Sequence, residues 1–203
     1  MKSNTNVMAK IQPGNSATKK EAIIQKAASL FKIKSYTAAS MRELAEMLGV
    51  EASSLYNHIG SKSELLQAIC FKVAKEVAVN LDFIESNAIS NISKIEAIIR
   101  FHIRIMLYNF DEVYVANHEW KHLKEPYLSD FLNFRRSYEK KLMMLIESGI
   151  ANNELKIINP YVATLTILSA VRGLEFYHGH KKNVLQEVLE NDMINHLLTG
   201  LAK

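Results

Sequence analysis

Hydrophobic residues recur along this chain at the three- and four-residue spacing of α-helices, without the alternation typical of strands. A helix places such residues on one face, which can then be buried against other helices. Similar patterns continue over most of the sequence, so we expect an all-α fold. Within residues 19–34 the predicted inward face comprises Ile23, Ile24, Ala27, Leu30 and Phe31.

Polar residues typical of helix starts precede several of these patterns. In a capping box, a Ser or Thr and a Glu three residues later each satisfy a free backbone N–H. Four such boxes occur, at Thr18–Glu21, Ser40–Glu43, Ser61–Glu64 and Ser93–Glu96, and Asn159-Pro160 gives a fifth start. We expect about nine helices, near residues 19–34, 41–48, 52–58, 62 to the high 80s, 94–109, within 111–125, 127–149, 160–178 and 184–201.

Composition agrees with long helices. Only 7 Gly and 3 Pro occur in 203 residues, too few turn residues for a strand-rich sandwich or barrel. The single cysteine, Cys70, cannot form an internal disulfide, which favours a reducing compartment. No apolar run is long enough to span a membrane, and residues 1–16 lack the apolar segment of a signal peptide. We therefore expect a cytoplasmic protein with no membrane partner, whose residues 1–17 form a disordered arm.

Positive charge is concentrated in the N-terminal third. The net charge is +4, but residues 1–63 carry nine Lys and Arg against four Glu, whereas residues 64–203 carry 16 basic against 17 acidic residues. A basic unit joined to a nearly neutral body is typical of proteins that bind a polyanion. A solvated basic surface would give the same charge, so charge alone leaves both interpretations open.

Residues 40–58 carry the most specific pattern, two short helices joined by a tight turn. Gly49 can adopt the left-handed conformation that ends the first helix, and Ala45 is small where the second helix must cross closely. The outer face of the second helix carries small, hydrogen-bonding and aromatic groups without an acid. These properties suit a helix in the major groove of DNA, where it must approach base edges without repelling phosphates.

Residues 18–66 resemble the DNA-binding head of the TetR/AcrR family of transcriptional regulators. The resemblance implies a head over residues 18–63 and a ligand-binding and dimerisation domain over residues 64–203. The sequence departs from common family residues at Ser35, Ala39, Asn57 and Ile59, and Asn57 would alter the base sequence that is read. The matching stretches are Ile24-Gln-Lys-Ala-Ala-Ser-Leu-Phe31, Ser40-Met-Arg-Glu-Leu-Ala45, Leu48-Gly-Val50, Leu55-Tyr-Asn-His58 and Gly60-Ser-Lys-Ser-Glu-Leu-Leu66.

The same resemblance implies which residues contact DNA. Tyr56 and His58 would contact the phosphate backbone, and Lys62 would hold a phosphate beside the N-terminus of the next helix. Ser40 and Arg42 would reach phosphate or base edges from the first short helix, and Ala52, Ser53 and Asn57 of the second would read the base sequence. The complete expected set is Ser40, Met41, Arg42, Ala52, Ser53, Ser54, Tyr56, Asn57, His58 and Lys62.

Aromatic residues gather in the C-terminal body. Helical spacing favours ordinary core packing for each one taken singly, but together they can line an apolar pocket between helices. Arg135 and Arg136 interrupt the aromatic helix, either as solvent-exposed residues or as partners of a ligand carboxylate or phosphate. The candidate ligand-binding set is Phe101, Tyr108, Trp120, Phe131, Arg135 and Tyr138.

Residues 95–200 also resemble the branch of the family that responds to fatty-acyl or steroid-type coenzyme A thioesters. This resemblance implies a small apolar or amphipathic effector, with an acyl-coenzyme A among the candidates. It rests on the stretches Arg135-Arg-Ser-Tyr-Glu139, Ile146-Glu-Ser-Gly149 and Asn153-Glu-Leu155, followed by a long helix.

The last two expected helices are rich in leucine. They would either cover the core of their own chain or, as the TetR resemblance implies, form a four-helix bundle with a second subunit. A homodimer would place two recognition helices about one DNA turn apart, on a palindrome. The expected dimer-interface residues are Leu165, Leu168, Val171, Leu189, Ile194 and Leu197.

His118-Glu-Trp-Lys-His122 matches the H-E-x-x-H pattern of zinc hydrolases. On one helix the two histidines would share a face and bind zinc, with Glu119 as the base. A third ligand at the expected spacing is missing, so an exposed helix surface is favoured, and metal binding or metallohydrolase activity is the alternative.

The sequence thus predicts a dimeric, ligand-responsive DNA-binding regulator, a repressor that a small lipophilic effector releases from a palindromic operator. We expect no enzymatic activity and no cofactor. A non-specific, architectural DNA-binding protein is a further alternative.

Overall fold

The computed structural model describes residues 16–179 and 184–201, and these ranges are helical without a strand. The all-α expectation is therefore confirmed over the described residues. The elements are α1 (Ser16–Lys34), α2 (Met41–Leu48), α3 (Ala52–Tyr56), α4 (Lys62–Ser86), α5 (Asn91–Tyr108), α6 (Phe110–His118), the 3-10 helix η1 (Trp120–His122), α7 (Tyr127–Ala151), α8 (Pro160–Arg172), α9 (Glu175–Gly179) and α10 (Gln186–Leu201).

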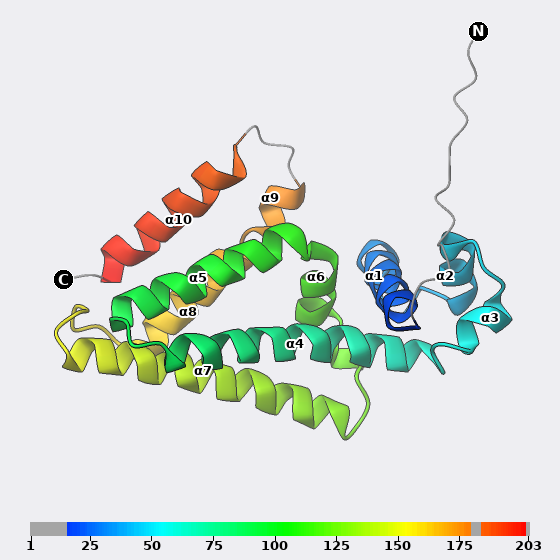
Figure 1. The fold of residues 1–203 in the computed structure, drawn as a ribbon, viewed down its shortest axis with the longest axis horizontal. Coiled ribbons are helices and arrows are strands. Elements are labelled where there is room, and N and C mark those ends of the chain that lie inside the picture. The colour runs from blue at the N-terminus through cyan, green and yellow to red at the C-terminus, as the bar shows by residue number, and fades with distance from the viewer. Residues whose placement is uncertain (1–15, 180–183, 202–203) are drawn as a thin grey trace, which may run out of the picture.

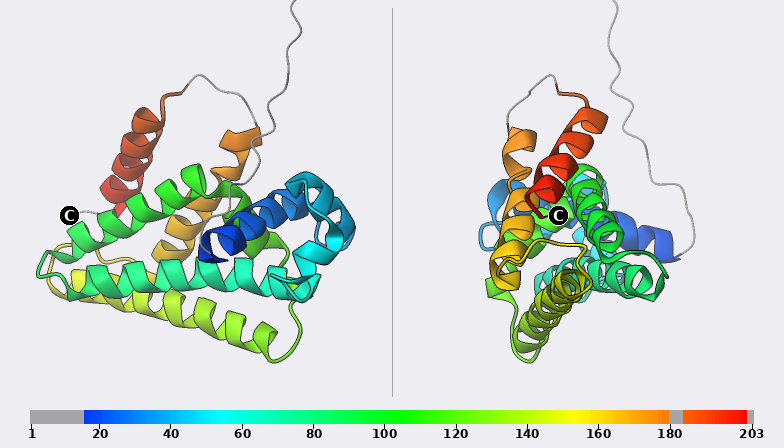
Figure 2. Two further views of the ribbon diagram at one scale, coloured as in Figure 1. Left: turned by 45° about the vertical axis from the view of Figure 1, so that its right-hand side comes forward. Right: turned by 90° about the vertical axis from the view of Figure 1, so that its left-hand side faces the viewer.

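The helices form a small head and a larger body, joined by α4 (Figure 1). Helices α1, α2 and α3 lie together at one end, and α4 runs from them along the long axis of the molecule. In the body, α7 packs on α4, α5 and α8, while α10 lies against α5 (Figure 2). Helix α6 packs against both α1 and α4, so it touches the head as well as the body.

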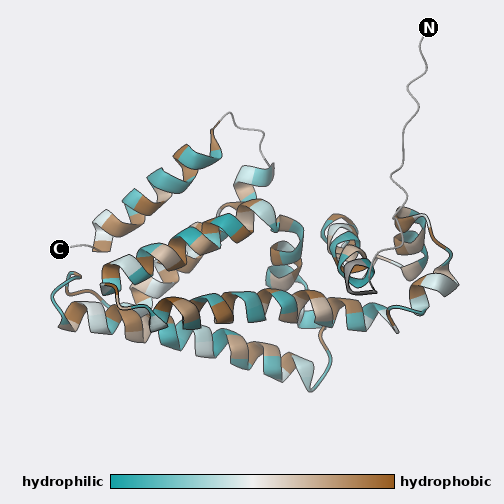
Figure 3. Ribbon diagram, in the orientation of Figure 1, coloured by the Kyte–Doolittle hydropathy of each residue, from teal (hydrophilic) through white to brown (hydrophobic). Residues whose placement is uncertain are grey.

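Two hydrophobic clusters hold the described helices together. The first contains Phe31, Leu44 and Leu55 of the head, together with Leu66 of α4 and Phe131 of α7. The second fills the far end of the bundle between α4, α5, α7, α8 and α10. Figure 3 shows the hydrophobic and hydrophilic positions that alternate around the helices. Because the first cluster crosses the expected boundary after residue 63, packing does not separate the head from the body there.

Most of the predicted helix starts are correct. Ser40 and Glu43 form a complete capping box, and Asn159 accepts hydrogen bonds from the backbone of Tyr161 and Val162. The Ser61 hydroxyl accepts a hydrogen bond from the Glu64 N–H and so caps α4. The Glu64 carboxylate, however, accepts from the N–H of Gly60 and not from that of Ser61.

Two predicted starts are wrong. Helix α5 begins at Asn91, because Ser90 rather than Ser93 accepts the capping hydrogen bond. Helix α1 begins at Ser16, so Thr18 lies inside it. The expected disordered arm therefore cannot include residues 16 and 17, and its residues 1–15 lie outside the described ranges.

Two helix ends also differ from the prediction. The expected helix over residues 160–178 divides into α8 and α9. Helix α7 continues past Gly149 to Ala151. A Cβ added at Gly149 would lie 2.6 Å from Cδ1 of Leu155, so this glycine allows close packing instead of ending the helix.

None of the described helices is both long enough and apolar enough to cross a membrane.

Candidate DNA-binding surface and effector cavity

The turn between α2 and α3 has the geometry that the sequence predicts. Gly49 has a φ of 66° and its N–H bonds to the carbonyls of Ala45 and Glu46. An L side chain rarely adopts this conformation, so glycine ends α2 here without strain. The buried Leu44 and Leu55 hold the two short helices on α1 and α4.

The exposed face of α3 carries four of the residues that are predicted to contact DNA. Ser53, Ser54, Tyr56 and Asn57 are exposed, and Tyr56 exposes half of its side chain. Ala52 is half-buried against the head core. The exposed face of α3 thus offers hydroxyl, amide and phenol groups to a partner.

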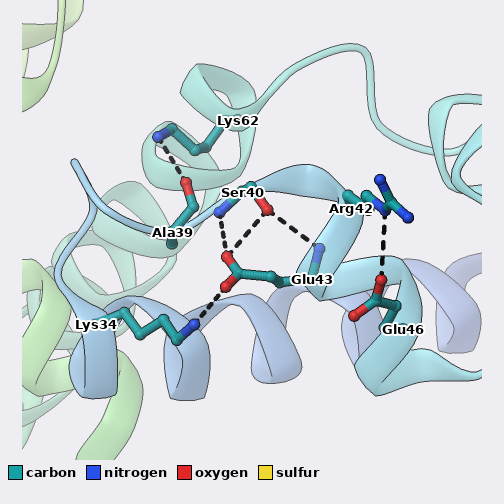
Figure 4. Close-up of polar contacts among 7 residues, drawn as sticks. All are labelled: Lys34, Ala39, Ser40, Arg42, Glu43, Glu46 and Lys62. Atoms are coloured by element: carbon teal, nitrogen blue, oxygen red, sulfur yellow. Dashed lines mark hydrogen bonds and ion pairs between the residues drawn. The ribbon is translucent and has the colours of Figure 1, made fainter.

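Side chains at the start of α2 form a polar network (Figure 4). The Ser40 N–H donates to the Glu43 carboxylate at 2.9 Å, and Lys34 forms an ion pair with the other oxygen of that carboxylate. The Lys34 and Ser40 contacts lower the pKa of Glu43 to about 2. The Arg42 side chain is mostly exposed, and its one ion pair among the described residues is with Glu46, at 3.4 Å. Arg42 is therefore free to turn towards phosphate.

Lys62 occupies a different environment from the one expected. Its Nζ donates to the carbonyls of Tyr36 and Ala39, at 2.9 and 2.8 Å, and lies 4.7 Å from the centroid of the Tyr36 ring. A third carbonyl, of Thr37, lies at 3.3 Å. Lys62 therefore holds the connection between α1 and α2 against the start of α4. A phosphate contact by Lys62 stays a prediction. Of the remaining predicted residues, Met41 and His58 are half-buried.

A cavity of about 130 Å³ lies in the body, between α4, α5, α6, α7 and α8. Three of the six predicted ligand-binding residues line it, namely Phe131, Arg135 and Tyr138. Trp120 lies behind them, because its ring stacks near Phe131 and has the Arg135 guanidinium 5.7 Å from its centroid.

The other two predicted ligand-binding residues do not line this cavity. Phe101 packs beside His102 in the core of the body. Tyr108 exposes 72% of its side chain, at the end of α5 and beside α1. Their prediction rests on aromatic character, which does not say which face of a helix a residue occupies.

Sequence reasoning missed most of the cavity wall. The apolar part comes from small and medium side chains of α4, α5, α6 and α8, and the missed polar residues are His102, Asn117, Glu139 and Arg172. His102 lies between Arg100 and Arg104 on α5, so nothing in the local sequence marks it as a cavity residue.

His102 and Tyr138 form a half-buried polar pair in the cavity wall. Nε2 of His102 lies 2.6 Å from the hydroxyl oxygen of Tyr138. Burial lowers the pKa of His102 to about 4 and raises the pKa of Tyr138. Both side chains are therefore uncharged near neutral pH.

Two arginines line the same cavity. Arg135 is half-buried and Arg172 lies at the end of α8. Burial and the positive charge of Arg172 lower the pKa of Arg135, while the nearby Glu139 carboxylate opposes this effect. Among the described residues, neither arginine forms an ion pair within 4 Å.

The H-E-x-x-H residues have structural roles in this fold. Helix α6 ends at His118, whose Nε2 lies 2.8 Å from a Glu175 carboxylate oxygen, whereas His122 lies on η1 and stacks on Tyr36. The two histidines thus face different partners. Within the described ranges, no group of three or more His, Cys, Asp or Glu side chains is arranged to hold a metal. The alternative of a metal-binding protein or metallohydrolase is not supported.

Glu119 instead connects the body to the head. It is buried, accepts a hydrogen bond from the Tyr36 N–H at 3.2 Å and lies 3.5 Å from Nε2 of His122. At the other end of α6, Asp111 accepts from Ser29 and pairs with Lys32 of α1. Both ends of α6 therefore bind the head.

Apolar side chains of α8 and α9, together with Leu185 just before α10, are exposed. Leu165 exposes 52% of its side chain, Phe176 75% and Leu185 73%, and Tyr161 and Val162 are also exposed. We call these five residues the apolar face. Exposed aromatic and aliphatic groups in one region are typical of an interface.

Five of the six predicted interface residues are less exposed than Leu165. Val171 and Ile194 are buried in the core of their own subunit, so their prediction as interface residues is wrong. Leu168 lines the cavity, and Leu189 and Leu197 are half-buried against the same core. Helical periodicity identified the apolar residues of α8 and α10 without separating the inward from the outward face.

These features define a helix-turn-helix protein with a cavity in its helical body, and comparisons with known proteins identify its family. A family model described as bacterial regulatory proteins, tetR family, matches residues 23–69. A second, described as tetracyclin repressor-like, C-terminal domain, matches residues 89–176. The chain belongs to the TetR family and is a ligand-responsive, DNA-binding transcriptional regulator.

Known relatives cover between 73% and 91% of this chain. The HTH-type transcriptional repressor KstR2 of Mycolicibacterium smegmatis is 21% identical over 150 residues, which is 73% of each chain. The structure of the ketosteroid transcriptional regulator KstR2 of Mycobacterium tuberculosis has a TM-score of 0.84 at 14% identity, over 91% of this chain and 95% of that one. AibR in complex with isovaleryl coenzyme A and operator DNA gives a TM-score of 0.77 at 21% identity, over 88% and 97%.

Proposed function

We propose that the protein is a homodimeric repressor that a small amphipathic effector releases from a palindromic operator. In this proposal the exposed face of α3 reads the operator, and the effector occupies the cavity of the body. The protein acts in the cytoplasm, where the operator is, and catalysis forms no part of its function.

The observation that carries the proposal is that two helices join the cavity to the head. Helix α4 lines the cavity with Val73, Ala74 and Val77, and its first turn carries Lys62, which holds the α1–α2 connection. Helix α6 lines the cavity with Ala116 and Asn117, and the adjacent Glu119 binds Tyr36 of the head. An effector that displaces either helix would therefore move the head.

The cavity favours an effector with an apolar part and a negative part. Its walls are mostly aliphatic and aromatic, which favours a hydrocarbon group. Arg135 and Arg172 supply positive charge without an ion-pair partner among the described residues, which favours a phosphate or carboxylate. An acyl-coenzyme A has both parts, and AibR, a structural relative, is described with isovaleryl coenzyme A and operator DNA.

The experiment first requires an operator, which footprinting on the DNA upstream of the gene would define. Fluorescence anisotropy would then measure operator affinity with isovaleryl-, octanoyl- or palmitoyl-coenzyme A, and with free coenzyme A as the control. We expect at least one thioester to weaken operator binding by about tenfold or more, since coupling energies of about 1–3 kcal/mol are common. If all three thioesters leave operator affinity unchanged at saturation, this effector class is rejected.

We further propose that the apolar face forms the dimer interface. Leu165→Glu would place a charge in the centre of that interface, and sedimentation should then show monomers. Ile33→Glu is the matched control, because Ile33 exposes 71% of its side chain on the head. A Leu165→Glu protein that remains dimeric would exclude this interface.

A further inference from the structure

The uncharged pair of His102 and Tyr138 is the strongest polar feature of the cavity that the proposed function leaves unexplained. His102 comes from α5 and Tyr138 from α7, and both line the cavity. His102 lies deep in the protein yet keeps accessible surface, because its ring borders the cavity. Aliphatic side chains such as Val77, Ile105 and Leu168 line the same cavity.

The pair has one hydrogen-bond donor more than its mutual contact uses. A neutral imidazole carries one N–H and a neutral phenol carries one O–H, so the pair holds two donors. Their mutual contact, at 2.6 Å, uses one of them. If Tyr138 donates to Nε2, the N–H at Nδ1 of His102 is left over. If Nε2 donates to Tyr138, the phenol O–H is left over.

The remaining donor needs a partner in the cavity. The contact with Tyr138 is the one hydrogen bond that the described structure gives the His102 ring, and the same is true of the Tyr138 hydroxyl. A donor without an acceptor in an apolar site costs about 1–3 kcal/mol. Water can satisfy such a donor, and a ligand that displaces this water must supply an acceptor or lose affinity.

We propose that the His102–Tyr138 pair recognises an uncharged carbonyl oxygen of the effector, such as the thioester carbonyl of an acyl-coenzyme A. This inference rests on the proposed function, which places the effector in the cavity. An uncharged acceptor fits because the pair carries no charge to balance a carboxylate, whereas Arg135 and Arg172 in the same cavity do. The effector thus binds through three distinct parts, a hydrocarbon group, a carbonyl and an anion.

The test compares two ligands that differ only at the carbonyl. The first is whichever of isovaleryl-, octanoyl- and palmitoyl-coenzyme A binds most tightly. The second is its S-alkyl thioether of equal chain length, in which CH2 replaces the C=O. Calorimetry on the full-length protein should show the thioester binding about tenfold more tightly, as expected for one buried hydrogen bond.

Variants assign this preference to the pair. In the double variant His102→Leu/Tyr138→Phe, which removes both donors, the affinity ratio between thioester and thioether should fall to about one. Tyr177→Phe is the control, because its hydroxyl bonds to the carbonyl of Val184 outside the cavity, and it should keep the wild-type ratio. His102→Gln, which retains an N–H donor, should keep most of the ratio.

The outcomes separate the two proposals. Equal binding of thioester and thioether by the wild-type protein, with release of the operator by both, overturns carbonyl recognition and leaves the proposed function standing. The same holds if the double variant is folded and keeps the wild-type ratio. If none of the three thioesters binds, the proposed effector class is rejected and carbonyl recognition with it. If the double variant does not fold, His102→Met/Tyr138→Phe, which also removes both donors but keeps an unbranched side chain at residue 102, replaces it in the same comparison.

Discussion

The DNA-binding head and the effector cavity are built in opposite ways. In the head, residues close in sequence make the decisive contacts, such as Ser40 with Glu43 and Gly49 with Ala45. In the cavity, the wall combines residues from five helices, and His102 meets Tyr138 across 36 positions. Local contacts can be read from short motifs, whereas the cavity is defined only once the helices have packed. A regulator can therefore keep one head and change its effector by altering a few wall residues.

The largest expected effect tests whether the two regions fold as one unit. Phe31→Ala removes a fully buried ring from the cluster that joins the head to α4 and α7. We expect the free energy of unfolding to fall by about 3–5 kcal/mol, as for other buried Phe→Ala changes. Urea unfolding followed by helix content and by the fluorescence of Trp120 should show one shared transition. A separate early transition of the head, invisible to Trp120, would contradict the shared core.

The next effect separates positioning from DNA contact within the head. Lys62→Ala leaves three carbonyls without their donor, so we expect a loss of about 1–3 kcal/mol in stability. Arg42→Ala, at a side chain that is 87% exposed, should leave stability unchanged but weaken operator binding and reduce its salt dependence. Thermal melts and anisotropy at several salt concentrations would measure both. Equal melting temperatures for the two variants would exclude the positioning role of Lys62.

A third prediction concerns the junction between the two regions. Glu119→Ala leaves the Tyr36 N–H without its acceptor, so we expect the free energy of unfolding to fall by about 1–3 kcal/mol. We also expect weaker coupling between effector and operator. Glu119→Gln keeps an oxygen acceptor and should cost less than half as much. Chemical denaturation of both variants checks this. A Gln variant as unstable as the Ala variant would show that the carboxylate charge, and not the hydrogen bond, is what matters.

The smallest effect is a pH dependence that arises in the cavity. Burial lowers the pKa of His102 to about 4, below the ordinary value near 6.5, so the unfolded chain takes up this proton first as pH falls. The contribution of His102 to stability is thus complete above pH 6.5 and is lost as pH falls towards 4. Its slope reaches at most about 1.4 kcal/mol per pH unit.

The Asp and Glu carboxylates titrate alike in wild type and in His102→Gln. The difference in stability between the two proteins therefore isolates the contribution of His102. Urea unfolding at pH 7.5, 6 and 5 should show the two proteins converging as pH falls. Parallel curves would show that His102 is not held neutral by its surroundings.

The sequence predicted the head more accurately than the cavity. The bounds of α2, the Ser40 capping box and the Gly49 turn follow from residues within a few positions of one another. Arg135 and Tyr138 were identified in the cavity, but Arg172 and His102 were missed, because their roles depend on how α5, α7 and α8 pack. Val171 and Ile194 were misplaced in the interface for the same reason, since an apolar residue on an amphipathic helix does not reveal which neighbour covers it.

The central claim is that effector in the cavity and operator on the head favour different states of one protein. Linkage requires each ligand to weaken the other by the same factor. The direct measurement is the affinity of the tightest-binding acyl-coenzyme A for the free protein and for the protein saturated with operator. We predict that operator weakens effector binding by the same factor, about tenfold or more, by which effector weakens operator binding. Equal effector affinity for the free and the operator-bound protein would contradict the account.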